Sequence, residues 1–193
     1  LFLEEIENLH LFDRIIGIEP SAKMAQVCRD RGFDVIQKYV EDAGSVNIDA
    51  TFLTAFEVIE HALDPLVFLL SAKRILCNGG LLMFTTLTVS GFDIQVLWEN
   101  SKSVYPPHHL NLLSVEGFRR LVERSGLELI SLQTPGELHV DIVRNICFEK
   151  SDIDIPRFAV SIINASEKVR SNFQNFLKAN NYSSHVQIIA RKP

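Results

Sequence analysis

The feature that most constrains the fold is an alternation of short apolar runs with helical patterns along most of the chain. Runs of strand length lie at residues 14–18, 33–39, 50–56, 81–87, 127–133 and 186–192. Amphipathic patterns of helical period lie between them at residues 22–31, 65–76 and 115–125. This alternation is typical of a mostly parallel sheet with helices on both faces. The sequence therefore predicts an α/β fold.

The start and stop signals of the helices agree with this assignment. Ser21 and Ser114 each precede a helical pattern and are good N-caps, while Gly32 and Gly126 follow one. We expect a turn at Gly79-Gly80 before the fourth strand, and a loop-rich stretch at residues 88–111.

About fifty residues separate the last two expected strands, far more than a hairpin loop needs. Residues 155–180 carry apolar side chains at helical spacing. We therefore predict one domain over residues 1–193, with a helical insertion at residues 136–182 that serves as a substrate cap.

Composition limits the partners. The chain of 193 residues has a formal net charge of -5, which gives no basic surface for nucleic acid. No apolar run approaches the roughly 20 residues that a membrane-spanning helix needs. Its three cysteines lack metal or disulfide spacing. We expect a cytoplasmic protein without a nucleic-acid or membrane partner, and the oligomeric state stays open.

An acid at the end of the first strand is the first candidate for a binding residue. In the stretch IIGIEPS, Glu19 follows the strand directly, and a helix begins after Ser21. Ligands of open α/β sheets bind outside the carboxyl ends of strands, and a carboxylate can accept both hydroxyls of a ribose. Alternatively, Glu19 only adds favourable negative charge before the helix.

Two further segments carry a family resemblance. TAFEVIEHALDPLVFL, at residues 54–69, follows the third strand, and HHLNLLS, at residues 108–114, precedes a helix. In this order they resemble the Rossmann-like S-adenosylmethionine-dependent methyltransferases, in the group with ubiquinone-pathway, sugar and small-molecule enzymes. The resemblance covers residues 1–132 and 186–191. It implies a Rossmann-like methyltransferase sheet whose last strand is antiparallel.

The resemblance also implies which residues hold the cofactor, S-adenosylmethionine. Glu19, with its neighbours Pro20 and Ser21, would hold the ribose. The segment 39–42, with Val40 and Glu41, would line the adenine. The turn at the end of the third strand would pass under the methionine portion; its residues are Ala55, Phe56 and Glu57.

The chain departs from this family in one respect. The family's first strand and its glycine-rich cofactor loop do not appear in the sequence, and Gly79-Gly80 precedes a strand instead of following one. We therefore expect an upstream segment, first apolar and then glycine-rich, that this sequence does not include.

The segment FEVIEH raises the question of a metal. Glu57, Glu60 and His61 are spaced i, i+3 and i+4, which places them on one face of a helix. With His109 they could bind a divalent cation, as in small-RNA 2′-O-methyltransferases. Alternatively Glu60 is solvated and His61 packs against the next helix, so no metal ligands are assigned.

His109 is the candidate catalytic residue, because an imidazole can take a proton from an acceptor hydroxyl. Alternatively it only holds its loop through a hydrogen bond. His139 and Asp141 are further candidates for an acceptor pocket, while Trp98 and Tyr105 could stack on the acceptor or form an apolar lid.

The function predicted is methyl transfer from S-adenosylmethionine to a small-molecule acceptor, at a hydroxyl or carbon of a sugar or other metabolite. Two alternatives stay open: a metal-assisted RNA 2′-O-methyltransferase, and a non-catalytic methyltransferase-like binding module. An NAD-dependent dehydrogenase also places an acid after its second strand, but the segments EVIEH and HHLNLLS argue against it.

Overall fold

The computed structural model describes residues 2–43, 48–150 and 152–193. Its elements, in chain order, are α1 (Phe2–Asn8), β1 (Ile16–Ile18), α2 (Ala22–Asp30), β2 (Asp34–Ile36), α3 (Val40–Ala43), β3 (Ala50–Phe56), the 3₁₀ turn η1 (Ile59–His61), α4 (Pro65–Ile75), β4 (Leu76–Leu87), α5 (Phe92–Leu97), η2 (Trp98–Asn100), α6 (Val115–Ser125), β5 (Glu128–Gln133), α7 (His139–Glu149), α8 (Arg157–Ile163), α9 (Glu167–Ala179) and β6 (His185–Arg191). Every strand and helix expected from the sequence is present, and all but β4 lie within three residues of their expected bounds.

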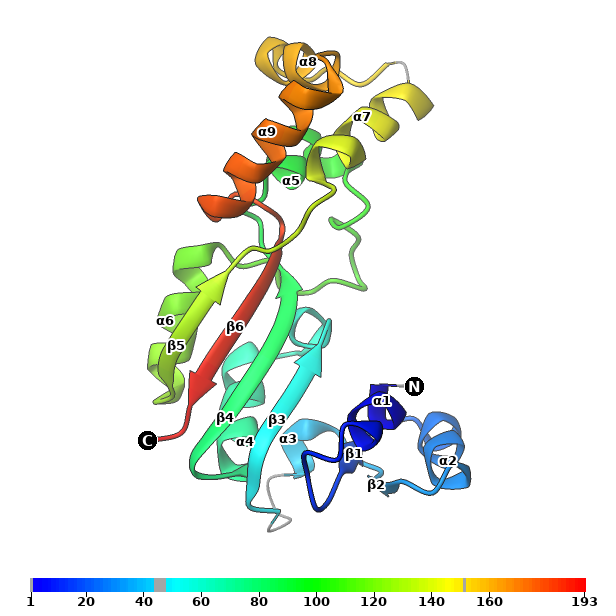
Figure 1. Cartoon of the computed structure of the whole chain (residues 1–193), viewed down its shortest axis with the longest axis vertical. Helices are drawn as coiled ribbons and strands as arrows, with labels where there is room; N and C mark the ends of the chain where they lie inside the picture. Colours follow the sequence, from blue (N-terminus) through cyan, green and yellow to red (C-terminus); the bar gives the residue numbers. More distant parts are fainter. Residues whose placement is uncertain (1, 44–47, 151) are drawn as a thin grey trace.

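The strands form two groups. The larger sheet has the order β3-β4-β6-β5, in which β3 and β4 are parallel and β6 is antiparallel to both of its neighbours (Figure 1). The antiparallel last strand is therefore confirmed. β1 and β2 form a separate parallel pair, and among the described residues no strand pairing joins that pair to β3.

Aromatic contacts bridge the space between the two groups of strands. Phe2 of α1 meets Phe56 edge-on, with ring centroids 4.9 Å apart, and Phe12 stacks on Phe52 at 5.9 Å. These contacts place the N-terminal segment against one face of β3. Phe52 and Phe56 nevertheless stay 36% and 37% exposed, so this face of the sheet is only partly covered.

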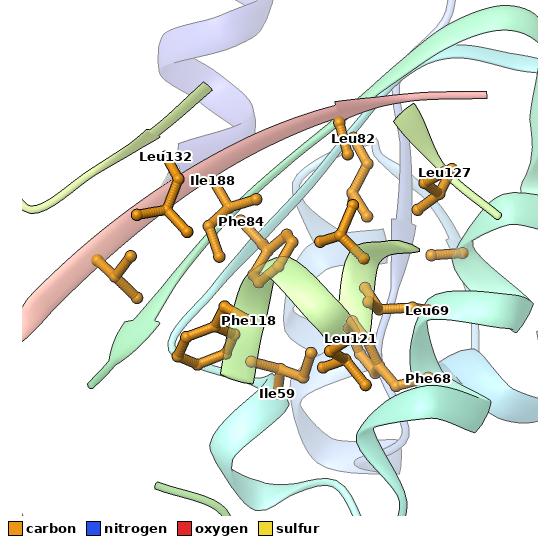
Figure 2. Close-up of a cluster of buried hydrophobic side chains, with 14 of the residues drawn as sticks. Ile59, Phe68, Leu69, Leu82, Phe84, Phe118, Leu121, Leu127, Leu132 and Ile188 are labelled. Atoms are coloured by element: carbon orange, nitrogen blue, oxygen red, sulfur yellow. The ribbon is translucent and has the colours of Figure 1, made fainter. Parts of the chain in front are cut away.

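The opposite face of the larger sheet forms the main core. Alternate residues of β4 and β6, among them Leu82, Phe84, Ile188 and Ala190, are fully buried on this face, as the strand period of two requires. Helices α4 and α6 cover them with an apolar layer that includes Phe68, Leu69, Phe118 and Leu121 (Figure 2). The core therefore sits between this sheet and α4 with α6.

The helix ends follow the sequence signals. The Ser21 and Ser114 hydroxyls accept hydrogen bonds from the N–H groups of Met24 and Gly117. Gly126 ends α6 with φ of 70°, in the left-handed region that glycine adopts without a steric cost.

Two expectations for the middle of the chain are wrong. β4 begins at Leu76 instead of after Gly80, because Leu76 already pairs with Ala50. The segment that was expected to turn is an irregularity within the strand, with Gly79 at φ of 78°. The stretch expected to be loop contains α5, whose start at Gly91 has no side-chain cap that could have signalled it.

The insertion between β5 and β6 is helical, as predicted. Helices α7, α8 and α9 pack with α5 into a second apolar cluster beyond one end of the larger sheet (Figure 1). Buried side chains of this cluster include Leu97 of α5, Val143 of α7, Ile163 of α8 and Leu177 of α9.

A buried polar group ties this cluster to the sheet. The Ser184 hydroxyl, just before β6, lies 3.0 Å from both Asp93 Oδ2 and His139 Nδ1. His139 Nδ1 is also 3.0 Å from Asp93 Oδ1, and all three residues are at most 4% exposed. Because buried polar groups are costly when separated from their partners, this contact fixes α5 and α7 against the start of β6.

Among the described residues, no helix combines the length and the apolar character that crossing a bilayer requires.

The position of the core predicts that alanine substitutions of two nearby leucines, Leu63 and Leu69, have very different effects on the free energy of unfolding. Leu69 is fully buried and Leu63 is 93% exposed. Leu69→Ala should lower the free energy of unfolding by about 2–5 kcal/mol, because it removes buried methyl groups and leaves a cavity. Leu63→Ala should change it by less than about 0.5 kcal/mol. Urea unfolding measures both, and equal effects would contradict the assignment of α4 to the core.

Candidate functional site

The site begins where β3 ends. Glu57 follows Phe56 with a φ of 52°, an uncommon conformation for a residue with a side chain. The Glu57 N–H still donates to Thr85 O of β4, 3.0 Å away. Backbone strain of this kind is often found at functional sites. It turns the chain sharply from the strand into η1.

Two adjacent threonines of β4 hold the two glutamates of this turn apart. Thr85 Oγ1 donates to Glu57 Oε1 at 2.8 Å, and Thr86 Oγ1 donates to Glu60 Oε2 at 2.7 Å. Consecutive residues of a strand point to opposite faces of the sheet. Glu57 is therefore held on the partly open face, while Glu60 is held on the core face.

This arrangement corrects one expectation. The spacing of Glu57, Glu60 and His61 predicted that they share a helix face, and this is wrong for Glu57. The residues form a strained turn followed by 3₁₀ structure instead of an α-helix. Glu57 instead has His185 as its neighbour, with Nδ1 at 3.4 Å from Oε1. The sequence reasoning singled out neither threonine nor His185; the only signal was the polar Thr-Thr pair in an apolar strand.

The segments EVIEH and HHLN, almost fifty residues apart, lie against each other. Glu60 O accepts from the N–H groups of Leu110 and Asn111, at 2.8 and 3.1 Å. The Asn111 side-chain amide donates to Ala62 O at 2.5 Å. These bonds bring His109 beside η1, where its ring centroid lies 5.0 Å from that of His61.

Two imidazoles meet the buried carboxylate at this junction. His61 Nδ1 lies 2.6 Å from His108 O, and His109 Nδ1 lies 2.8 Å from Ser103 O. Because carbonyl oxygens only accept hydrogen bonds, both Nδ1 atoms must carry the proton. In the neutral rings, each Nε2 therefore presents a lone pair.

The ligand atoms of Glu60, His61 and His109 all lie within 4.8 Å of one another. His61 Nε2 is 4.0 Å from Glu60 Oε1, and the two imidazole centroids are 5.0 Å apart. The Glu60 side chain is 1% exposed and that of His61 is 45% exposed. Burial raises the pKa of the Glu60 carboxyl, and the hydrogen bond from Thr86 opposes that rise. The cluster thus has a buried carboxylate on its inner side and a partly exposed imidazole, that of His61, on its outer side.

The residues expected at the cofactor lie after three strands. Glu19 follows β1, and its Oε1 accepts from the Ser21 N–H at 2.8 Å. Part of the alternative interpretation therefore holds, because this carboxylate supports the turn into α2. Ser21 is the N-cap of that helix, and Pro20 between them is exposed.

The other expected cofactor residues occupy two positions. Val40 and Glu41 open the short helix α3 and are half-buried. Ala55 and Phe56 are the last residues of β3. Their cofactor contacts, like those of Glu19 and Glu57, stay predictions.

The remaining candidates separate into buried and exposed residues. His139 belongs to the buried contact with Asp93 and Ser184, so its position is structural. Asp141 lies 3.8 Å from the Arg170 Nε. Trp98 and Tyr105 are more than half exposed, and Tyr105 stacks on His108.

The model of the methyltransferase domain family matches residues 1–132, about two thirds of the chain. The chain belongs to this family. The methyltransferase match ends near the end of β5 and leaves out the helical insertion. A comparison with curated protein sequences gives no match.

Solved methyltransferase structures share the fold. A SAM-dependent methyltransferase from Archaeoglobus fulgidus superposes with a TM-score of 0.61 at 18% identity, covering 99% of this chain and 80% of the other. One from Thermotoga maritima gives 0.58 at 21% identity, with 92% and 72% covered. A geranyl diphosphate methyltransferase in complex with SAM gives 0.59 at 12% identity, with 98% and 73% covered.

These findings confirm several expectations for the methyltransferase. It has the Rossmann-like α/β fold, it is an enzyme of the S-adenosylmethionine-dependent class, and its cofactor is S-adenosylmethionine.

The threonine contacts predict unequal costs for two adjacent substitutions. Thr86→Val removes the donor to a buried carboxylate and should lower the free energy of unfolding by about 1–3 kcal/mol. Thr85→Val removes a donor to the half-exposed Glu57, which water can replace, and should cost less than about 1 kcal/mol. Denaturant unfolding of both variants measures this. A larger cost for Thr85→Val would contradict the placement of Glu60 on the core face.

Proposed function

We propose that this methyltransferase transfers the sulfonium methyl of S-adenosylmethionine to a small-molecule acceptor, at a hydroxyl or carbon of a sugar or other metabolite. The observation that carries the proposal is the junction of Glu60, His61 and His109 at the end of β3. It offers nitrogen lone pairs and a carboxylate at the rim where the strands of the larger sheet end, and ligands of such folds bind at the carboxyl ends of strands.

The cofactor site is proposed at Glu19, Pro20, Ser21, Val40, Glu41, Ala55, Phe56 and Glu57. The Ser21 N–H fixes the rotation of the Glu19 carboxylate through Oε1. A carboxylate oxygen can accept more than one hydrogen bond, so both oxygens of Glu19 can still accept from a ribose. Glu57, held by Thr85 on the face opposite Glu60, lies on the cofactor side of the turn in this proposal.

His109 is proposed to act on the acceptor. Because Ser103 O accepts from Nδ1–H, Nε2 carries the lone pair of this imidazole, which lies in the cluster with Glu60 and His61. That nitrogen can accept the proton of an acceptor hydroxyl as the oxygen attacks the methyl group. Holding the two reactants in line supplies the rest of the rate, as is usual for a displacement between bound partners.

The helical insertion is proposed to cap the acceptor pocket. It lies beyond the end of the larger sheet at which β4 ends and β6 begins (Figure 1). The polar contact of Asp93, His139 and Ser184 fixes it there. Residues Leu138 and Phe148 of this segment are 63% and 69% exposed and could meet an apolar acceptor.

The net charge of -5 supports a small-molecule acceptor over nucleic acid. The three cysteines are free in the structure, in keeping with the cytoplasmic location that we propose.

Glu19 gives the test of the cofactor site. Glu19→Ala should weaken binding of S-adenosylhomocysteine about 10- to 100-fold, because hydrogen bonds to a charged group contribute about 1.5–3 kcal/mol. Isothermal titration calorimetry measures the affinity. The control is Glu116→Ala, which removes an exposed carboxylate of α6 paired with Arg120 and should leave the affinity unchanged. Equal affinities for wild type and Glu19→Ala would overturn this site.

His109 gives the test of the acceptor site. His109→Ala should lower kcat about 100-fold or more, as expected for loss of a general base, without changing the affinity for S-adenosylhomocysteine. Transfer of labelled methyl to a panel of hydroxylated metabolites measures kcat. His108→Ala removes the neighbouring exposed imidazole and should retain wild-type kcat. Wild-type turnover by His109→Ala would remove this residue from the reaction.

A further inference from the structure

A carboxylate and an imidazole meet on the partly open face of the larger sheet, the face opposite Glu60. Glu57 Oε1 accepts from Thr85 Oγ1 at 2.8 Å and lies 3.4 Å from His185 Nδ1. Glu57 directly follows β3, Thr85 belongs to β4, and His185 is the first residue of β6. The strand order β3-β4-β6 therefore brings these residues together where β3 and β4 end. Ligands of open α/β sheets bind at the carboxyl ends of strands.

Glu57 and His185 each have one polar side-chain atom engaged and one free. Because His185 Nδ1 faces a carboxylate, that nitrogen carries the proton, and Nε2 of the neutral ring presents a lone pair. Thr85 and His185 both approach the same carboxylate oxygen, Oε1. Among the residues that the structure describes, no hydrogen bond engages Glu57 Oε2 or His185 Nε2. The pair thus offers two free acceptor atoms and no free donor.

The pair also carries a negative charge that a ligand can reach. With a neutral imidazole, its charge is that of the Glu57 carboxylate. Within the described part of the chain, no Lys or Arg forms an ion pair with this carboxylate. The side chains of Glu57 and His185 are 42% and 38% exposed, so both are open to solvent. A cationic ligand is therefore the complementary one.

The backbone of Glu57 indicates that its side chain has a role. Its φ of 52° lies in the left-handed region, which glycine adopts without a steric cost. A glutamate at this position bears strain that a glycine would avoid, and strained residues of this kind cluster at binding and catalytic sites. The hydrogen bond from Thr85 also fixes the rotation of the carboxylate. A solvated surface acid needs neither feature.

We propose that Glu57 and His185 form a binding site for a primary ammonium group. An ammonium has a positive charge and three N–H donors, which match the negative charge and the two free acceptors of the pair. A guanidinium needs both carboxylate oxygens for a bidentate contact, and Oε1 is already engaged. A quaternary ammonium has no N–H to donate. The chemistry of the pair therefore selects the primary ammonium among organic cations.

Two molecules can supply this group, namely the amino-acid end of S-adenosylmethionine and an amine on the acceptor. The first source rests on the proposed cofactor site, which includes Glu57. The second source rests on the proposed methyl transfer and would narrow the acceptor to an amine-bearing metabolite. His185 opens the strand that follows the helical insertion, so the pair adjoins the proposed cap as well as the turn after β3.

Two nucleosides test the cofactor as the source. S-adenosylhomocysteine has the amino-acid end, whereas methylthioadenosine lacks it and keeps the adenine and the ribose. If the cofactor supplies the ammonium, Glu57→Gln and His185→Ala should each weaken S-adenosylhomocysteine binding about tenfold or more and leave methylthioadenosine binding unchanged. Titration calorimetry measures both affinities. Glu19→Ala should weaken both nucleosides, because Glu19 is proposed to hold the ribose that they share.

A matched pair of small probes tests the ammonium site itself. Ethanolamine and ethylene glycol differ in having an ammonium or a hydroxyl at one end, and NMR follows the ring signals of His185 during their titration. In the ligand-free protein, ethanolamine alone should shift these signals saturably, and Glu57→Gln should weaken its binding at least about tenfold. With S-adenosylhomocysteine bound, this response persists if the acceptor supplies the ammonium and disappears if the cofactor does.

The controls are two side chains outside the pair. Glu116→Gln changes an exposed carboxylate of α6, and His108→Ala removes an exposed imidazole; both variants should retain wild-type affinities. Thermal unfolding checks that every variant is folded. Equal responses to ethanolamine and ethylene glycol, or ethanolamine binding that survives Glu57→Gln, would refute the ammonium site. Unchanged binding of both nucleosides by Glu19→Ala would contradict the proposed cofactor site alone.

Discussion

Strand β4 is the element on which the rest of the structure depends. It pairs with β3 on one side and with β6 on the other, and it is the longest strand among the described residues. Leu82 and Phe84 point into the core from one face, so its register fixes that of both neighbours. At its end, Thr85 and Thr86 place one glutamate on each face of the sheet. The alternation of side chains along β4 that builds the core therefore also places Glu57 and Glu60 on opposite faces of the sheet.

That division gives the two sides of the turn different chemistry. On the partly open side, Glu57 has a hydroxyl and the imidazole of His185 as neighbours and stays half-exposed. On the core side, Glu60 is buried beneath two imidazoles whose Nδ1 atoms are fixed by carbonyls. A cofactor that needs an accessible carboxylate suits the first side, while an acceptor that must be polarised suits the second. The positive φ of Glu57 turns the chain so that the two glutamates lie on opposite faces of the sheet.

Much of the fold could be predicted from the sequence because its signals are local. Ser114 and Gly126 predicted both ends of α6, and the run of strand-forming residues after Asp49 predicted β3. The missed features are those that local patterns do not carry. β4 begins before the Gly79-Gly80 pair because Leu76 already pairs with Ala50, and residues 79 and 80 exchange backbone hydrogen bonds with Lys192 across the irregularity. α5 forms without a side-chain cap because Ile94 and Leu97 are buried, Leu97 against the helical insertion.

The candidate site, like the fold, was only partly predictable from the sequence. The sequence by itself determined the residue types, the acid after the first strand, the glutamates and histidine after the third, and the distant His109. Only the tertiary structure decided which of them meet. Helical spacing predicted that Glu57 lies beside Glu60. The left-handed backbone conformation of Glu57 and the hydroxyls of Thr85 and Thr86 instead hold the two carboxylates on opposite faces of the sheet. His61 and His109 became neighbours through backbone bonds from Leu110 and Asn111 to Glu60. The spacing of residues in the sequence fixes the directions of their side chains only inside a regular helix or strand. This site forms after β3 has ended and before the next α-helix begins.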